Sequence, residues 1–284
     1  METAPAELSR TARHRRTVGA RRWRQLPPRF LAPLYALYTR RLRRRVAAAP
    51  PPRHVAVILD GNRRWASLTG LHVAGAGHRR GADKLDELLR WCGTLGIGEV
   101  TVWALSSENL TRASGELGAL VEVLTEKLHA FADGSAEPSL RVRVFGRIDT
   151  LPARLAAAAR RAQLETAGRG GVCLNIALGY SGRDELVDAA RSVVRSLAAE
   201  GIPPERMLDR IDADAIARHL YTAEHSDPDL IIRTSGEMRL SGFLPWQSSH
   251  SEFYFTDIYW PAFRELDFLR AIRTYQARDR RFGR

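Results

Sequence analysis

Residues 54–66 read HVAVILDGNRRWA, and this stretch decides the fold of the chain. Its five consecutive apolar residues, 55–59, predict a buried strand of a sheet that is covered on both faces. The run ends at Asp60 and Gly61, a pair that is typical of a turn, and two arginines then enter a predicted helix. A buried strand that leads through a polar turn into a helix is the opening of a βαβ unit.

The same alternation of strand and helix continues along the chain. Short apolar or alternating runs predict strands at Val55–Leu59, Val100–Leu105, Arg141–Phe145, Val172–Leu178, Leu230–Ile232 and Phe253–Phe255. Segments of helical length lie between them, at Arg79–Leu95, Leu117–Ala132, Ala153–Ala167, Arg183–Ala199 and Ala213–Leu220. We therefore expect an α/β fold with a mostly parallel central sheet flanked by helices, in a single domain.

The positive charge of the chain is confined to an N-terminal arm, residues 1–53. This arm holds 14 arginines against Glu2 and Glu7, which accounts for the whole formal net charge of +12. Residues 54–284 are therefore formally neutral, and we expect them to form the folded catalytic domain. A nucleic-acid-binding protein would owe its affinity to the arm alone, and we expect no nucleic acid partner.

The arm itself divides into two parts. Residues 1–28 are rich in Arg, Ala and Pro without apolar periodicity, which predicts disorder. Apolar residues at helical spacing predict an amphipathic helix near residues 30–46, namely Phe30, Leu34, Leu37, Tyr38 and Leu42. Two interpretations of this helix remain open: it packs on its own domain, or it binds anionic lipid head groups at roughly 1 kcal/mol per basic residue.

Cysteine content and hydropathy indicate the compartment. Cys92 and Cys173 are too few for a disulfide framework, which fits a reducing cytoplasm. No apolar run reaches the roughly 18 residues of a membrane span, and no apolar segment follows the N-terminal arginines as in a signal peptide. We expect a cytoplasmic protein, with peripheral contact to the inner face of the membrane as the alternative if the arm binds lipid.

Polar residues follow four of the predicted strands. Ligands of such sheets bind beyond the carboxyl ends of the strands. Asp60 can hold a magnesium ion while neighbouring backbone N–H groups hold phosphate oxygens, and Arg233 and Arg239 are suited to clamp a diphosphate. The other two polar segments are residues 106–112 and 179–183, and each segment alone could equally be a solvated loop.

Two common phosphate-binding motifs are absent from the sequence. It contains neither the pattern G-x-x-x-x-G-K-[ST] nor a G-x-G-x-x-G that opens a helix. An enzyme that uses nucleotides is therefore disfavoured.

Residues 54–66 resemble the signature of the cis-prenyltransferase (undecaprenyl diphosphate synthase-like) family, and the D-G-N-x-R-W element is its most specific part. Further matching segments follow in the family's order and spacing, at 106–112, 232–243, 246–247, 251–257 and 260–261. Within the family the chain resembles the actinobacterial short-chain (2Z,6E)-farnesyl diphosphate synthase type, through Leu59, Arg63, residues 34–38 and residues 280–284. The chain lacks the Asp-Asp-x-x-Asp cluster of trans-prenyltransferases.

The resemblance implies a Mg²⁺-dependent enzyme that condenses isopentenyl diphosphate with an allylic diphosphate, geranyl or farnesyl, to give a Z-polyprenyl diphosphate. Ionising an allylic diphosphate needs charge at the mouth of the site, while the growing chain needs an apolar substrate tunnel. The helix Leu117–Phe131 and strand residues such as Val102 are candidates for the tunnel wall, or else plain core. A non-catalytic partner subunit of the same fold would lack the first motif and the arginine clamp, which this chain retains.

Two departures from the family pattern bear on product length. Ala74 stands where many long-chain members carry an arginine, which favours a short-chain enzyme. Ala104 stands where short-product relatives place a bulky residue, so the usual plug is missing. We expect a short or medium product, and three alternatives remain: a long-chain (decaprenyl or undecaprenyl) diphosphate synthase, irregular coupling, and terpene cyclisation.

The resemblance also implies roles for single residues. Asp60 would be catalytic and hold the metal, with Glu252 completing the metal site. The family often assigns Asn109 as proton acceptor, but an amide is not a base near neutral pH, so we expect it to position a substrate group instead. The substrate-binding residues would be Gly61, Asn62, Arg63, Arg64, Trp65, His78, Ser106, Ser107, Glu108, Arg112, Arg233, Arg239 and Ser241.

The end of the chain resembles a family element that joins two subunits. Family members are typically homodimers in which a C-terminal Arg-x-Gly of one subunit reaches the site of the other. Arg281 and Gly283 fit that pattern. The resemblance therefore implies a homodimer with shared active sites.

Overall fold

The computed structural model describes residues 32–111 and 114–278, and the chain divides into two compact units, residues 1–38 and 39–284. The described part of the first unit is helical and begins helix α1 (Ala32–Ala47), which the sequence predicted near residues 30–46. The segment 1–28, for which we predicted disorder, lies outside the described residues. The assignment of residues 54–284 as the catalytic domain stays a prediction.

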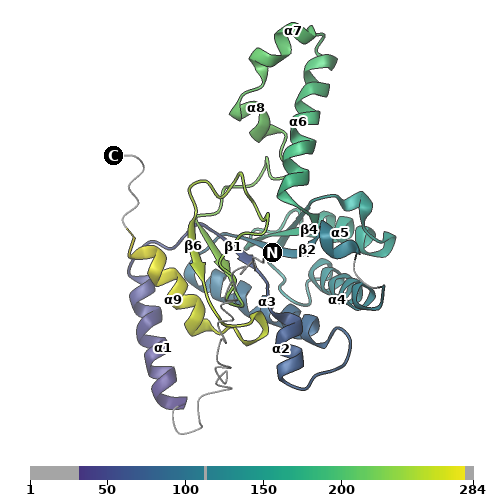
Figure 1. Cartoon of the computed structure of the whole chain (residues 1–284). Helices are drawn as coiled ribbons and strands as arrows, with labels where there is room; N and C mark the ends of the chain where they lie inside the picture. Colours follow the sequence, from purple (N-terminus) through teal and green to yellow (C-terminus); the bar gives the residue numbers. More distant parts are fainter. Residues whose placement is uncertain (1–31, 112–113, 279–284) are drawn as a thin grey trace, which may run out of the picture. The chain divides into compact units, whose positions relative to one another are not determined.

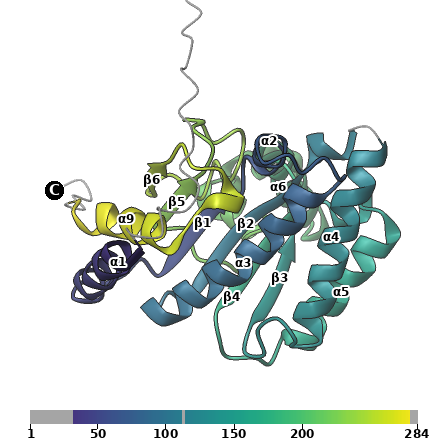
Figure 2. The ribbon, with the colours of Figure 1, turned by 90° about the horizontal axis from the view of Figure 1, so that it is seen from below.

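The second unit is built on a central six-stranded sheet (Figure 1). Its strand order is β3-β4-β2-β1-β5-β6 (Figure 2). The strands are β1 (His54–Ile58), β2 (Glu99–Ser106), β3 (Arg141–Phe145), β4 (Cys173–Tyr180), β5 (Leu230–Arg233) and β6 (Glu252–Phe255). Every described pairing is parallel, which confirms the predicted α/β fold. All five residues of β1 are buried, as expected for a strand with neighbours on both edges and helices on both faces.

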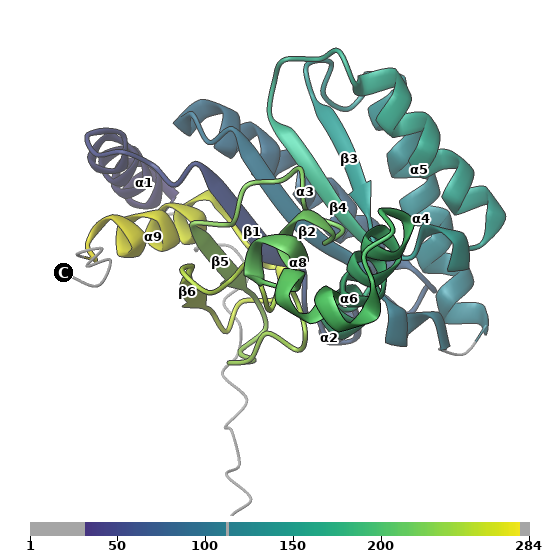
Figure 3. The ribbon, with the colours of Figure 1, turned by 90° about the horizontal axis from the view of Figure 1, so that it is seen from above.

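Helices cover both faces of the sheet. Figure 2 shows α3 (Ala76–Leu95) and α4 (Ser114–Ala132) on one face, with α5 (Ala153–Thr166) beside α4 at the edge strand β3. Figure 3 shows α6 (Gly182–Ala199) and α8 (Ala213–Arg218) on the other. The remaining helices are α2 (Asn62–Leu68), α7 (Pro204–Met207) and α9 (Glu265–Gln276), with 3₁₀ turns η2 (Ser107–Thr111), η3 (Ile148–Thr150), η4 (Leu208–Arg210) and η5 (Trp260–Ala262).

All helices and strands predicted from the sequence are present, but the structure contains further helices that were not predicted. α9 and the single turn α7 were not predicted from the sequence. α9 has a clear helical pattern, because Leu266, Leu269 and Ile272 are buried at helical spacing. Predicted and observed boundaries differ by a few residues, as at α3, which begins at Ala76 instead of Arg79.

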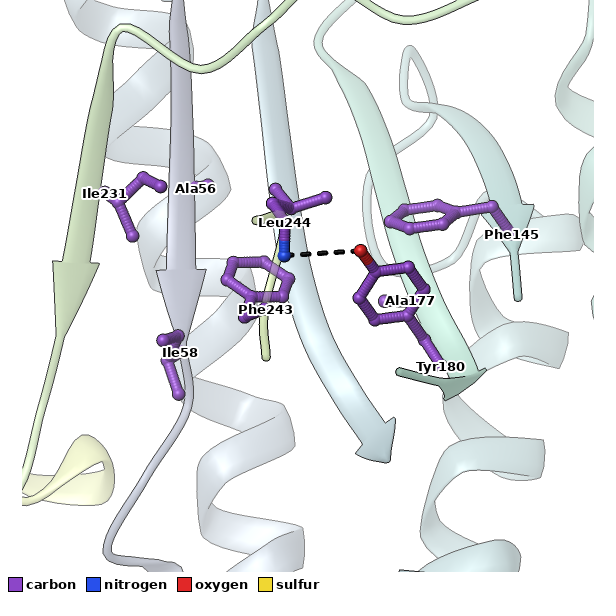
Figure 4. Packing of buried hydrophobic residues seen from close by; sticks show 8 residues of the cluster. All are labelled: Ala56, Ile58, Phe145, Ala177, Tyr180, Ile231, Phe243 and Leu244. Carbon is purple, nitrogen blue, oxygen red and sulfur yellow. Dashed lines mark hydrogen bonds between the residues drawn. The ribbon is translucent and has the colours of Figure 1, made fainter. Parts of the chain in front are cut away.

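Aromatic side chains cover the face of the sheet that carries α6. The cluster consists of Ala56, Ile58, Phe145, Ala177, Tyr180, Ile231, Phe243 and Leu244 (Figure 4). Phe243 comes from the loop after β5 and stacks on Trp103 of β2 at a centroid distance of 5.3 Å. The backbone N–H of Leu244 donates to the Tyr180 hydroxyl at 3.2 Å. The loop between β5 and β6 is therefore fastened to the sheet.

The second half of α1 packs on the folded domain. Leu42 and Val46 are buried, and the Arg43 guanidinium donates two hydrogen bonds of 2.7 Å to Glu265 of α9. Gln276 Nε2 donates to the Val46 carbonyl at 2.9 Å. These contacts support the interpretation of a helix packed on its own domain. In the described ranges, no helix has the length and hydropathy to cross a bilayer.

Candidate active site

A cavity of about 720 Å³ lies between the sheet and helices α3 and α4. Asp60, Arg64 and Arg233 line its polar end, which is at the carboxyl ends of β1 and β5. The rest of the wall is mainly apolar and includes Val102 of β2 and a stripe along α4. Both candidates for tunnel walls named from the sequence therefore line one cavity with a charged mouth and an apolar interior.

The pairing of β1 with β5 fixes the backbone of Asp60. Ile58 lies opposite Arg233 in the parallel register, so the residues that follow the two strands meet. The Thr234 hydroxyl donates to the Asp60 carbonyl at 2.8 Å and lies 3.0 Å from the Asp60 backbone N–H, which donates to it. The Trp260 N–H also donates to the Asp60 carbonyl, at 3.0 Å. The Asp60 carboxylate is consequently presented from a rigid backbone.

Two guanidinium groups bracket the Asp60 carboxylate. Arg233 Nη2 lies 3.1 Å from one oxygen and Arg64 Nη2 lies 3.3 Å from the other. Burial acts to raise the pKa of Asp60, but hydrogen bonds from Arg233 and Ser235 and the charge of Arg64 outweigh it, so the pKa is lowered. Asp60 is therefore ionised at neutral pH.

The arginines are themselves held in place. Arg64 Nη2 donates to Ser235 Oγ at 2.7 Å, and its guanidinium lies 5.5 Å from the ring centre of Tyr259. Arg233 is only 5% exposed and donates through Nη1 to Ser241 Oγ at 2.9 Å. In the described part of the chain Arg233 Nε has no hydrogen-bond partner, so this buried cation retains a spare donor.

The backbone of the mouth needs a glycine at position 61. Gly61 has φ 98°, a left-handed conformation that disfavours side chains, and a Cβ there would lie 2.5 Å from Tyr259 Cδ1. The chain therefore turns tightly from β1 into α2, bringing Asp60 and Arg64 to the same side of the mouth.

The loop after β5 is held in a strained form. Three non-glycine residues have positive φ angles: Ser235 at 79°, Ser241 at 53° and Leu244 at 48°. Such conformations are unfavourable and persist only where neighbouring contacts impose them. Because both serines hold guanidinium groups, this strain lies in the segment that orients Arg64 and Arg233.

A buried carboxylate, Glu185, anchors this loop. It is fully buried in α6 and accepts hydrogen bonds from the Tyr180 hydroxyl at 2.7 Å, the Thr222 hydroxyl at 3.3 Å and Gln247 Nε2 at 3.1 Å. Burial raises the pKa of Glu185, although the three donors act to lower it. The sequence analysis missed this residue, and its only signal was its place just after the polar segment 179–183.

Most of the predicted site residues line this one cavity. The lining set contains Asp60, Gly61, Asn62, Arg63, Arg64, His78, Ser106, Glu108, Asn109, Arg233 and Ser241. Three others lie outside the described wall: Trp65 is in α2, Ser107 donates to Asp184 at 3.0 Å, and Arg239 is exposed and pairs with Glu237 at 2.6 Å. Arg112, Arg281 and Gly283 lie outside the described residues.

Glu252 is not brought to Asp60 in this structure. It begins β6, opposite Leu230 in the parallel register, whereas Asp60 follows the other end of β1. Its carboxylate forms an ion pair with Arg278. Across residues 32–111 and 114–278, no group of three or more His, Cys, Asp or Glu side chains is arranged to hold a metal ion. Among these residues, Asp60 is therefore not joined at the mouth by two further side chains of these four types.

Comparison with known proteins gives the family. The family model with the description "Putative undecaprenyl diphosphate synthase" matches residues 58–283. The chain belongs to this family, the cis-prenyltransferases. It is therefore a prenyltransferase, as the resemblance in the sequence predicted.

Named relatives and a solved structure agree with this membership. The (2Z,6E)-farnesyl diphosphate synthase of Thermobifida fusca is 51% identical over 251 residues, 88% of this chain and 97% of the relative. The short-chain Z-isoprenyl diphosphate synthase of Mycobacterium bovis is 47% identical over 262 residues, 91% of this chain and 97% of the relative. The crystal structure of lavandulyl diphosphate synthase from Lavandula x intermedia with dimethylallyl diphosphate has a TM-score of 0.76 at 33% identity, covering 82% of this chain and 99% of that one.

Proposed function

We propose that this prenyltransferase condenses isopentenyl diphosphate with geranyl or farnesyl diphosphate in the cis sense and releases a short-chain Z-prenyl diphosphate. The observation that carries the proposal is the Asp60 carboxylate, bracketed by Arg64 and Arg233, at the mouth of an apolar cavity. The names of the Thermobifida and Mycobacterium relatives support the short product.

The donor set at the mouth fits a magnesium ion that is shared with substrate. Protein sites for Mg²⁺ commonly use one or two carboxylates together with substrate phosphates. Asp60 is a carboxylate whose pKa is lowered, so it is ionised and can serve as such a ligand. Asp60 would hold the ion, which would supply positive charge against the departing diphosphate. Glu252 as a second metal ligand stays a prediction.

The residues of the chain divide the remaining work. Arg64 and Arg233 bind diphosphate oxygens, and each guanidinium is oriented by a serine hydroxyl. Because diphosphate is the leaving group, these cations stabilise the transition state in which its charge develops. The apolar wall receives the prenyl chain and excludes water from the allylic cation. Asn109 at the mouth, as an amide, orients a substrate group and does not take up the proton.

Three further expectations complete this proposal. Arg281 and Gly283 would reach the site of a second copy in a homodimer. Arg112 would add a contact to the allylic diphosphate. Exposed arginines of α1, such as Arg44 and Arg45, would make the peripheral membrane contact.

The test is an assay of the full chain with labelled isopentenyl diphosphate, Mg²⁺ and dimethylallyl, geranyl or farnesyl diphosphate in turn. We expect Z-configured products from at least one starter, no turnover after chelation of the metal, and recovery when Mg²⁺ is added back. Product length and double-bond geometry are read by chromatography and NMR after dephosphorylation. No condensation with any starter would refute the proposal.

Irregular coupling is the second candidate function. The match to lavandulyl diphosphate synthase supports it, because the two chains share the fold at 33% identity. It would appear in the same assay as a branched product formed from dimethylallyl diphosphate alone.

A further inference from the structure

One charged residue interrupts the apolar wall of the cavity. The face of α4 that lines the cavity consists of Leu120, Val123, Leu124, Lys127, Leu128 and Phe131. The spacing is that of one helical face, so Lys127 stands in line with its apolar neighbours. The other charged lining residues lie in α2, at the carboxyl end of β5 or just after β1 and β2, where diphosphate would bind.

Lys127 lies deep in the cavity. α4 follows β2 and leads back toward the amino end of β3, so it runs away from the mouth. Lys127 is seven residues beyond Leu120, about 10 Å further along the helix axis. Phe131 follows one turn later and is fully buried. The ammonium group is therefore placed near the end of the cavity that is remote from Asp60.

The Lys127 ammonium is tied to the neighbouring helix. Nζ donates a hydrogen bond to Asp86 Oδ2 of α3 and lies 5.3 Å from the ring centre of Phe131. The Lys127 side chain is 15% exposed and that of Asp86 29%. Asp86 Oδ1 is buried without a hydrogen-bond partner among the described residues, and burial raises the pKa of Asp86 even beside the lysine. The ion pair spans the α3–α4 gap in a partly dehydrated state.

We infer that Lys127, held by Asp86, determines product length by placing an ion pair where the tail of a longer prenyl chain would pass between α3 and α4. Each prenyl unit added along the apolar wall gains from burial of hydrocarbon. A unit that reaches Lys127 would instead strip the remaining water from the ion pair, and desolvation of charge opposes burial. Elongation beyond this depth is disfavoured. The inference rests on the proposed function.

This role answers a question raised by the sequence. Ala104, on β2, lines the same cavity but is too small to act as the plug of short-product relatives. A charged pair on the opposite, helical wall can limit the chain without filling space, because it acts through desolvation instead of bulk.

The test compares product lengths of wild type and Lys127→Met, which removes the charge but keeps an unbranched side chain of similar length. With geranyl diphosphate, isopentenyl diphosphate and Mg²⁺, we expect the main product of Lys127→Met to be longer by at least one isoprene unit. The double variant Lys127→Met/Asp86→Asn removes both charges and covers the case in which an unpaired Asp86 destabilises the single variant. It should show the same lengthening.

Glu126→Gln is the matched control. Glu126 is the adjacent residue of α4 and forms an ion pair with Arg79 of α3, but it is exposed and does not line the cavity. Its loss removes one α3–α4 ion pair without changing the cavity wall. The control should therefore retain the wild-type product.

A second measurement makes the test independent of turnover. Calorimetry would compare the affinities of farnesyl and geranylgeranyl diphosphate, and only the longer ligand should bind more tightly to Lys127→Met. Unchanged product lengths and unchanged affinity ratios in both Lys127 variants would overturn the inference. A longer product from Glu126→Gln as well would also overturn the inference. The general packing of α3 against α4, and not Lys127, would then determine product length. If wild type makes no prenyl product, the proposed function itself fails.

Discussion

At the amino ends of the strands His54, Glu99 and Asn175 form a hydrogen-bonded network, whereas at the carboxyl ends Asp60 and Arg233 face a cavity. In the first network each His54 ring nitrogen has a partner at 2.7 Å, Ser226 O and Thr101 Oγ1. Both Glu99 carboxylate oxygens accept hydrogen bonds, from Asn175 and Ser226. His54 and Glu99 therefore have their side-chain hydrogen bonds satisfied within this network.

The carboxyl end is different because a polar group there has a hydrogen-bonding atom without a partner. Arg233 Nε is buried beside the cavity and lacks a hydrogen-bond partner among the described residues. Buried polar atoms of a folded protein are normally paired, so unpaired ones beside a cavity point to a ligand. The comparison shows that buried polarity alone does not mark a site; incomplete pairing beside open volume does.

The largest expected effect is a loss of activity on substitution at the carboxyl ends of the strands. Asp60→Asn should lower kcat/KM by about 10³-fold, or about 4 kcal/mol, because it removes the charge at the mouth on which the metal and both guanidinium groups depend. Steady-state kinetics measure the loss, and circular dichroism should show an unchanged fold. Full activity in Asp60→Asn would contradict the assignment of the carboxyl end as the site.

The next effect belongs to the amino end and should leave catalysis intact. Glu99→Gln turns an acceptor that receives two hydrogen bonds into a group with a donor facing other donors, which should cost about 2 kcal/mol of unfolding free energy. Urea denaturation measures that loss. kcat/KM below the denaturation range should stay within about twofold of wild type. A large fall in kcat/KM with unchanged stability would break the contrast between the two ends.

The smallest effect concerns Glu185 of α6, which binds Gln247 in the loop between β5 and β6. Because its pKa is raised on folding, the unfolded chain releases this proton at a lower pH than the folded protein does. The contribution of Glu185 to the free energy of unfolding is therefore fully present at a pH below its pKa in the unfolded chain. It declines as the pH rises through its pKa in the folded protein.

Glu185→Gln should abolish that part of the pH dependence. The difference in unfolding free energy between wild type and the variant, measured by urea denaturation from pH 4 to 8, should change in favour of the variant as pH rises. If this difference in unfolding free energy does not change with pH, or changes in favour of wild type as the pH rises, the raised pKa of Glu185 is contradicted. A matched loss of isopentenyl diphosphate affinity would show that the loop also positions Arg233.

Much of the candidate site could be predicted from local sequence. Asp60 stands directly after a buried strand and before a glycine and arginines, which is a local arrangement. Arg233 is likewise the last residue of a short apolar strand. Contacts made by residues without a local pattern could not be predicted, such as Glu185 with Gln247 or Lys127 with Asp86. In a pattern of apolar and polar positions, Lys127 is simply one polar residue of a helix.

By itself the amino-acid sequence determined the alternation of strands and helices, the strand ends that carry charge, and the family, because each of these depends on neighbours in the chain. Only the tertiary structure decided which strand ends meet. The order β2-β1-β5 places Arg233 against Asp60, while the parallel register of β6 puts Glu252 at the opposite end of the sheet. Strand order and register arise from long-range pairing and burial, which no local pattern encodes.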